Sequence, residues 1–193
     1  INLNEGEMNQ RKEKGREEAI KKLALELGGH APFIVFEDAD LDAAVEGALQ
    51  SKFRNSGQTC VCTNRFYAHE SIYDAFVEKL SAGAKKIRVG DGFGAGINQG
   101  PMIDAQAVAK VEEHVADALK QGASLQAGGK LLEAGKLFYE PTVLSNVTYG
   151  MLIMNEETFG PVAAVVRFKT EEEVVAAAHN TDIALASSVS SRN

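Results

Sequence analysis

Cysteine is scarce in this 193-residue sequence, which has only Cys60 and Cys62. A disulfide between residues so close together would close too small a loop to hold a fold together. Two thiols also fall short of the four ligands of a structural zinc site. Two interpretations remain open, a reactive thiol with a neighbouring thiol or two inert buried side chains.

Long apolar runs and an excess of positive charge are absent as well. No stretch approaches the roughly 18 consecutive apolar residues that a membrane-spanning helix needs. The formal net charge is −7, which disfavours nucleic-acid binding because such binding depends on neutralising phosphates. The first residues contain no apolar signal core. We therefore expect no membrane or nucleic-acid partner, and a location in the cytoplasm or, in a eukaryote, the mitochondrial matrix.

Histidine is also sparse, with four residues in the chain. They are His30, His69, His114 and His179. Their scattered positions show no metal-ligand spacing, so we expect them to pack in the core or face solvent and we predict no metal site.

Residues 1–18 differ from the rest because they are highly charged and show almost no apolar periodicity. We interpret them as a tail, a solvated helix or a junction. From residue 19 to residue 193 the pattern indicates one domain, in which short apolar runs alternate with helical patterns.

The alternation predicts an α/β fold with a mostly parallel sheet flanked by helices. Strands are expected at residues 33–36, 65–68, 124–127, 139–145, 162–168 and 185–190. Helices are expected at residues 41–54, 72–87, 108–119 and 171–179.

A glycine-rich stretch at residues 90–95 formally matches the dinucleotide-binding pattern G-x-G-x-x-[GA]. That fingerprint must join a strand to a helix whose amino end meets the pyrophosphate. Here the glycines follow a predicted helix and lead into another loop, so we interpret the stretch as a surface loop.

Three short motifs contain residue types that are typical of catalysis. They are Leu25-Glu26-Leu27-Gly28-Gly29, Phe53-Arg54-Asn55-Ser56-Gly57-Gln58-Thr59-Cys60-Val61-Cys62, and Glu156-Glu157-Thr158-Phe159-Gly160-Pro161-Val162. Glu26 is either a general base or an ordinary exposed side chain. Cys60 follows a predicted helix, and a loop thiol becomes an effective nucleophile only where donors or positive charge stabilise the thiolate. The third motif, taken alone, is a turn that enters a strand.

Together, in this order and spacing, the motifs resemble those of the aldehyde dehydrogenase superfamily. Cys60 stands 34 residues after Glu26, and Glu157 nearly a hundred residues after Cys60. The resemblance covers residues 19–193 and implies the catalytic-domain fold of that family. It also implies a homo-oligomer at full family length.

The resemblance implies NAD- or NADP-dependent oxidation of an aldehyde. Cys60 would attack the aldehyde to give a thiohemiacetal, with its own backbone N–H among the donors that stabilise the oxyanion. Hydride loss would leave a thioester, which water activated by Glu26 would hydrolyse. Glu157 would bind the nicotinamide ribose, and Phe159 would pack near the nicotinamide.

The second motif is most similar to that of succinate-semialdehyde dehydrogenases. This similarity implies that Arg54 binds the distal carboxylate of succinic semialdehyde, which a guanidinium pairs with through two charge-assisted hydrogen bonds. Taken alone, Arg54 is a surface arginine at a helix end. Cys62 is a redox candidate, because a reversible disulfide with Cys60 would switch the enzyme off, or else a small packing residue.

A complete member of the family is longer, with a cofactor domain before the first motif and further elements after residue 193. We therefore expect a C-terminally incomplete catalytic domain without its cofactor domain, which alone binds NAD or NADP weakly and is inactive. Two other functions stay open, a dehydrogenase for another aldehyde and a non-catalytic association module that uses the fold.

Overall fold

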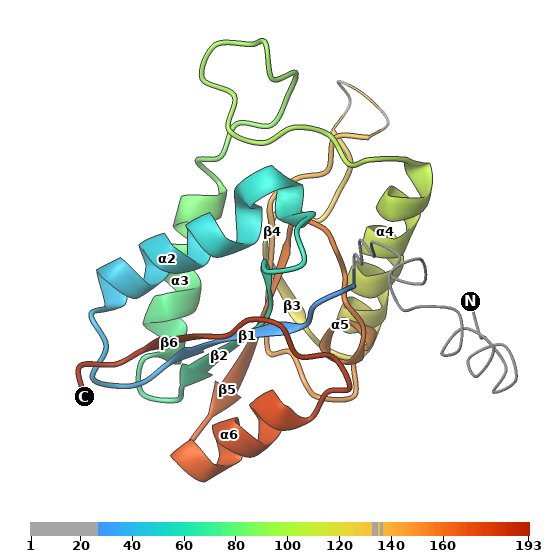
Figure 1. Cartoon of the computed structure of the whole chain (residues 1–193). Helices are drawn as coiled ribbons and strands as arrows, with labels where there is room; N and C mark the ends of the chain where they lie inside the picture. Colours follow the sequence, from blue (N-terminus) through green and yellow to red (C-terminus); the bar gives the residue numbers. More distant parts are fainter. Residues whose placement is uncertain (1–26, 133–134, 136) are drawn as a thin grey trace, which may run out of the picture.

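The computed structural model describes residues 27–132, 135 and 137–193 (Figure 1). Its strands are β1 (Ala31–Val35), β2 (Thr63–His69), β3 (Ser124–Ala127), β4 (Thr142–Ser145), β5 (Val162–Phe168) and β6 (Ser188–Ser190). Its helices are α2 (Leu41–Phe53), the 3-10 turn η2 (Arg54–Gly57), α3 (Tyr73–Ala84), α4 (Ala105–Lys120), α5 (Leu152–Asn155) and α6 (Glu171–His179).

The strands form one sheet in the order β3-β4-β5-β2-β1-β6. Every neighbouring pair is parallel except β3 with β4. Helix α2 connects β1 to β2, and α6 connects β5 to β6. Parallel strands need such crossover connections, because a tight hairpin can join only antiparallel strands. The predicted mostly parallel sheet flanked by helices is confirmed.

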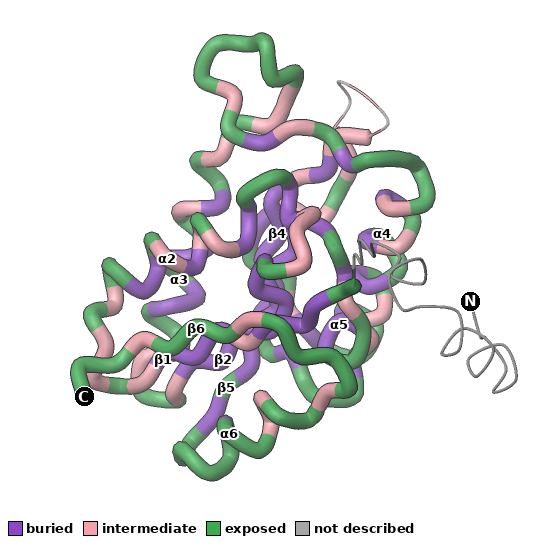
Figure 2. Tube along the Cα trace, in the orientation of Figure 1, coloured by how far each residue is buried: buried purple, intermediate pink, exposed green. Residues whose placement is uncertain are grey.

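Alternating side chains divide the core between the two faces of the sheet. On β5, Ala163 and Val165 pack with α2 and α3, whereas Ala164 and Val166 pack with α4, α5 and α6. Figure 1 shows the two groups of helices on opposite sides of the strands, and Figure 2 shows the central strands buried and the outer loops exposed. Both faces are covered, so β1 and all of β5 except Arg167 are apolar, whereas β2 contains the buried polar residues Asn64 and Arg65.

Several predicted elements agree with the structure at both ends, namely the strands at residues 124–127 and 162–168 and the helix at residues 171–179. The short helix α5 was not predicted, because four residues are too few to show helical periodicity. Strand β6 is shorter than predicted, since only Ser188–Ser190 pair with β1.

The glycine-rich stretch is a loop, as predicted. It is closed at its base by a bridge between Val89 and Gln99, and Phe93 at its tip is fully exposed. In the part of the chain that the structure describes, each helix is too short or too polar to cross a bilayer.

Candidate active site

The described residues of the three sequence motifs meet at one end of the sheet, where β1, β2 and β5 begin. Gly28 and Gly29 lie just before β1, Cys60 and Cys62 just before β2, and Glu157 just before β5. These three strands are neighbours in the sheet, and they run parallel. Residues that precede adjacent parallel strands lie at the same end of the sheet. The topology therefore brings together segments that are up to about 130 residues apart in the sequence.

The loop that holds Cys60 begins with an abrupt end to α2. Asn55, Ser56 and Gly57 all have positive φ, at 51°, 59° and 72°, a region that few non-glycine residues adopt. The Asn55 side chain compensates by donating to the Gln58 carbonyl at 3.0 Å. The turn then continues to Cys62, whose N–H donates to the Thr59 carbonyl at 2.9 Å.

Gln58 fixes this loop to a second loop at residues 100–103. Its side-chain amide donates to the Pro101 carbonyl at 3.2 Å, and its oxygen accepts from the Ile103 N–H at 2.8 Å. Ser56 adds a bond to the Gly100 carbonyl at 2.9 Å. The loop that contains Cys60 is therefore held by the loop at residues 100–103 as well as by the sheet.

The two thiols differ in their surroundings. Cys60 is partly exposed and Cys62 is buried, and neither forms a disulfide. The Cys62 thiol faces the Arg54 carbonyl at 3.8 Å. The Cys60 N–H has no hydrogen-bond partner among the residues the structure describes, and a free backbone donor beside a thiol is what an oxyanion requires.

Gly29 touches the backbone of Cys60 directly. A Cβ on Gly29 would lie 1.9 Å from the Cys60 carbonyl oxygen, so only glycine permits this approach. Gly57 makes a similar contact with Gly160, where a Cβ would lie 2.2 Å from the carbonyl oxygen. Glu26, the predicted general base of the first motif, lies outside the described residues.

Glu157 is oriented toward the first motif. Its Oε1 accepts a hydrogen bond from the Gly29 N–H at 2.9 Å, and its backbone carbonyl accepts from Lys110 Nζ at 2.6 Å. Glu157 also borders a small polar cleft with Asn180 and Asp182. Phe159 has a positive φ of 51° and a side chain that is 38% exposed, so its ring faces outward beside Glu157.

Arg54 lies at the exposed rim of the site. It ends α2 and begins η2, and its side chain is open to solvent. The structure thus places Cys60, Glu157, Phe159 and Arg54 in loops around one end of the sheet.

Buried polar residues beneath these loops escaped the sequence analysis. Lys52 is 1% exposed and donates to the Thr63 carbonyl at 2.9 Å. Burial lowers the pKa of Lys52 to about 8, against the raising effect of Cys62 and Glu157. Arg65 is equally buried and donates to the carbonyls of His30, Ala177 and Ala178. The sequence signal for Arg65 was a charged residue in a predicted strand, whereas Lys52 lies in the last turn of α2, where a basic residue is common.

His30 is buried at the start of β1, which agrees with the expected packing role. Its Nε2 lies 2.8 Å from the Met154 carbonyl and its Nδ1 lies 2.9 Å from the Asn64 side-chain nitrogen. Burial lowers the pKa of His30. Within the described residues, His, Cys, Asp and Glu form no group of three that could bind a metal.

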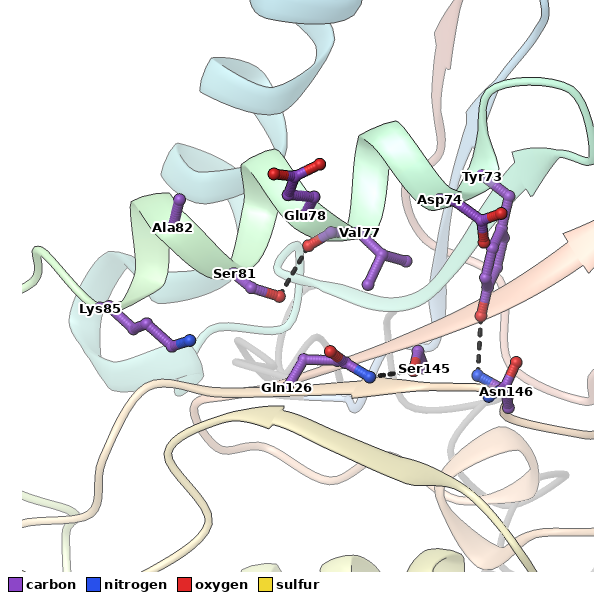
Figure 3. Close-up of a pocket in the computed structure, with 10 residues that line it drawn as sticks. All are labelled: Tyr73, Asp74, Val77, Glu78, Ser81, Ala82, Lys85, Gln126, Ser145 and Asn146. Carbon is purple, nitrogen blue, oxygen red and sulfur yellow. Dashed lines mark hydrogen bonds between the residues drawn. The ribbon is translucent and has the colours of Figure 1, made fainter.

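A separate cleft lies between α3 and the β3–β4 pair (Figure 3). Four of the residues that line it, Tyr73, Gln126, Ser145 and Asn146, are paired with one another. The Asn146 N–H donates to the Tyr73 hydroxyl at 2.7 Å, and Gln126 donates to Ser145 at 2.8 Å. None of the three motifs contributes to its lining.

Comparison with known proteins agrees with this geometry. The sequence model of the aldehyde dehydrogenase family matches residues 8–193. The glutarate-semialdehyde dehydrogenase of Pseudomonas aeruginosa is 59% identical over 168 residues, which are 87% of this chain and 35% of that protein. The succinate-semialdehyde dehydrogenase of Escherichia coli, whose name specifies NADP(+), is 57% identical over 86% of this chain and 35% of that protein.

Solved structures show the same fold. The crystal structure of succinate-semialdehyde dehydrogenase from Burkholderia pseudomallei superposes with a TM-score of 0.88 at 54% identity, over 96% of this chain and 39% of that one. A 3,6-anhydro-L-galactose dehydrogenase in complex with NAP superposes with a TM-score of 0.84 at 43% identity, over 88% of this chain and 36% of that one. The chain spans about a third of the length of the curated relatives it matches. From its motifs, its sheet and these matches, the chain belongs to the aldehyde dehydrogenase family.

Proposed function

We propose that these residues form part of an enzyme that oxidises succinic semialdehyde to succinate with NADP or NAD. The observation that supports this most directly is the meeting of Cys60, the Gly28-Gly29 turn and Glu157 at the amino ends of β1, β2 and β5. The names of the relatives support the substrate class, since several are semialdehyde dehydrogenases.

The chain's own residues would divide the reaction as follows. The Cys60 thiolate attacks the aldehyde carbon, and the carbonyl oxygen becomes an oxyanion beside the Cys60 N–H. A nicotinamide cofactor, held by Glu157 and Phe159, would supply the hydride acceptor that turns the thiohemiacetal into a thioester. Glu26 then removes a proton from water, which attacks the resulting thioester, releases the carboxylic acid and restores the thiol.

Glu157 and Phe159 fit the nicotinamide half of such a cofactor. Glu157 uses one carboxylate oxygen for the Gly29 N–H, which leaves acceptor capacity for the hydroxyls of a ribose. Phe159 offers an exposed ring, and an aromatic face packs well against another planar ring. We assign both residues to cofactor binding.

We assign Arg54 to the distal carboxylate of the substrate. Its exposed position at the rim of the Cys60 loop suits a group that binds the end of the substrate remote from the aldehyde. Loss of a bidentate guanidinium–carboxylate pair is expected to lower kcat/KM for succinic semialdehyde about 10- to 100-fold.

The function is tested in an enzyme of full family length. In this full-length chimera, the matched residues of the chain replace the matching 35% of the Escherichia coli enzyme. We expect NADPH formation from succinic semialdehyde, a loss of about 10⁴-fold or more in kcat with Cys60→Ser, and near-normal turnover with Cys62→Ser. An inactive chimera that is folded, or a Cys60→Ser variant that keeps its rate, would overturn the assignment.

Substrate choice needs a separate comparison in the same chimera. Arg54→Met is expected to lower kcat/KM for succinic semialdehyde. For butanal, which lacks the distal carboxylate, kcat/KM should stay within about threefold of its original value. An equal loss for both aldehydes would show that Arg54 acts on the loop and not on the carboxylate.

We also propose Cys62 as the partner of Cys60 in a reversible oxidation. Peroxide would oxidise the two thiols to one disulfide and be reduced to two waters. Mass spectrometry of the chain after mild peroxide treatment should detect the Cys60–Cys62 crosslink and its reversal by thiol. A sulfenic or sulfonic acid on Cys60 without any crosslink would refute the proposal.

A cytoplasmic or mitochondrial location and a homo-oligomeric assembly complete the proposal. The rat and human relatives are named as mitochondrial enzymes.

A further inference from the structure

We infer that Asn64 is a positioning residue, which fixes Glu157 in the orientation that cofactor binding needs. This inference rests on the proposed function of Glu157. It concerns a residue outside the three motifs, four positions after Cys60 in strand β2.

The Asn64 side chain binds both peptide groups that flank Glu157. Its Oδ1 accepts from the Thr158 N–H at 3.1 Å, and its Nδ2 donates to the Glu156 carbonyl at 3.1 Å. Asn64 is 2% exposed, so water does not compete for these bonds. One buried amide therefore fixes the backbone of Glu157 on both sides, much as a neighbouring strand would.

The same amide reaches His30, the residue that follows the first motif. Asn64 Nδ2 lies 2.9 Å from His30 Nδ1 and also donates to the Ile153 carbonyl at 3.2 Å. Since the amide nitrogen carries only donor protons, His30 Nδ1 faces it as an acceptor. The proton of the neutral imidazole is then on Nε2, which donates to the Met154 carbonyl at 2.8 Å.

Burial and the positive groups around His30 favour its neutral state. Burial is the largest cause of its lowered pKa, and Arg65, Lys52 and His114 add to it, against a raising effect of the bond to Met154. A protonated His30 would set an N–H against the Asn64 N–H. The neutral ring therefore keeps the donor of Asn64 in place.

These bonds have a direct consequence for the Glu157 carboxylate. With its backbone fixed by Asn64 and by Lys110, the side chain extends to the Gly29 N–H. Asn64 thus connects the segment before β1, its own strand β2 and the segment before β5. Catalytic geometry depends on such support, because a displacement of about 1 Å can lower a rate about 100-fold.

Replacing an ordinary buried asparagine would lower the stability of the whole fold. Replacing a positioning residue would in addition disturb the groups that it holds, here the backbone and carboxylate of Glu157. The Gly29 amide distinguishes the two, because it donates to Glu157 and reports the place of that side chain without any cofactor or substrate. Ser145→Ala provides the matched control, since Ser145 is a buried polar residue of β4 that bonds Gln126 and Ser124, outside the three motifs.

The first measurement is amide hydrogen exchange by NMR on the 193-residue chain. With Asn64→Ala, we expect the protection of the Gly29 and Thr158 amides to fall about tenfold or more beyond the change at β4 amides. Asn64→Asp keeps the acceptor for Thr158 and loses the donors, so it tests the inference if Asn64→Ala does not fold. Unchanged Gly29 protection in a folded Asn64 variant would overturn the inference.

The second measurement uses the full-length chimera. Asn64→Asp is expected to raise KM for NADP about 10- to 100-fold, while acylation of Cys60 by p-nitrophenyl acetate, which needs no cofactor, changes by less than about threefold. Ser145→Ala should change neither the KM for NADP nor the acylation rate of Cys60. An active wild-type chimera whose Asn64 variants keep their KM for NADP refutes the positioning role alone, whereas an inactive wild-type chimera refutes the proposed function and leaves the exchange test standing.

Discussion

Gly29 and Cys60 approach one another through main-chain atoms, and this contact sets how near the first motif comes to Cys60, the proposed nucleophile. The separation of 1.9 Å between a built Cβ and the Cys60 carbonyl oxygen is too short for any side chain. Since the obstructing atom belongs to the backbone, a substitution can be accommodated only if the loop moves.

Gly29→Ala is therefore expected to displace the Cys60 loop. Overpacking of this kind destabilises by about 1–3 kcal/mol, and we expect acylation of Cys60 by p-nitrophenyl acetate to slow about 100-fold. Gly100→Ala is the control, because a Cβ at that position meets nothing within 4 Å. Equal acylation rates in the two variants would contradict the importance of the contact.

Lys52 presents a different kind of constraint, a buried amine under the same loop. Burial lowers its pKa from 10.5 to about 8 in the folded chain. Between these two values the unfolded chain binds more protons on this amine than the folded chain does, so the amine makes stability rise with pH across this window. Below about pH 8 both states are charged, and the folded state bears the full penalty of about 3 kcal/mol.

We expect Lys52→Met to remove this pH dependence. Urea unfolding should show that the free energy of unfolding of the variant, relative to that of the original chain, falls by up to about 3 kcal/mol as the pH rises from about 8 to about 10.5. The comparison between the two chains cancels the titration of groups that do not interact with Lys52. A constant difference would mean that the Lys52 pKa is not lowered.

At the level of elements, the amino ends of β1, β2 and β5 explain why three short motifs form one site. The sequence predicted all three strands and placed a motif immediately before each. It did not establish that these strands are neighbours, because strand order depends on the packing of the whole sheet. The parallel register of Ala31 with Thr63 and of Arg65 with Ala164 provides that information.

The residues that sequence reasoning missed share a physical reason. Asn64 and Lys52 act on backbone groups that are near in space and, for Asn64, about 90 residues away in sequence. Hydrogen bonds to main-chain atoms leave no complementary residue type to recognise. Elements with clear periodicity, such as α6 and β5, were predicted because their signal is local.

Helix α4 offers a prediction of its own, because it supplies Lys110 to the Glu157 carbonyl. Its first residue is preceded by Asp104, whose carboxylate accepts from the Ala107 N–H at 2.8 Å. Asp104→Ala is expected to lower the free energy of unfolding by about 1 kcal/mol. Gln106→Ala, an exposed substitution in the same first turn, should stay within about 0.5 kcal/mol in the same urea titration; equal effects would exclude capping as the cause.

For the whole molecule, we expect a low cofactor affinity, because the chain spans only about a third of the length of its relatives. The ribose contact proposed for Glu157 is a single hydrogen-bonding site, worth about 1–3 kcal/mol, whereas micromolar binding requires about 8 kcal/mol. We expect calorimetry to show no saturable binding of NADP to the 193-residue chain below about 1 mM. Micromolar binding would mean that residues of the chain other than Glu157 and Phe159 contact the cofactor.

The position of all three motifs before their strands also determines where the chain tolerates changes in length. One residue added between a motif and its strand would shift a reacting group by about 3.3 Å, the rise of one strand residue, which exceeds the tolerance of a hydrogen bond. The opposite ends of the same strands lead into the segments at residues 36–40, 70–72 and 169–170. Insertions, affinity tags or grafted binding loops placed in those segments would leave the spacing of the reactive groups intact, which makes that edge of the sheet the one to engineer.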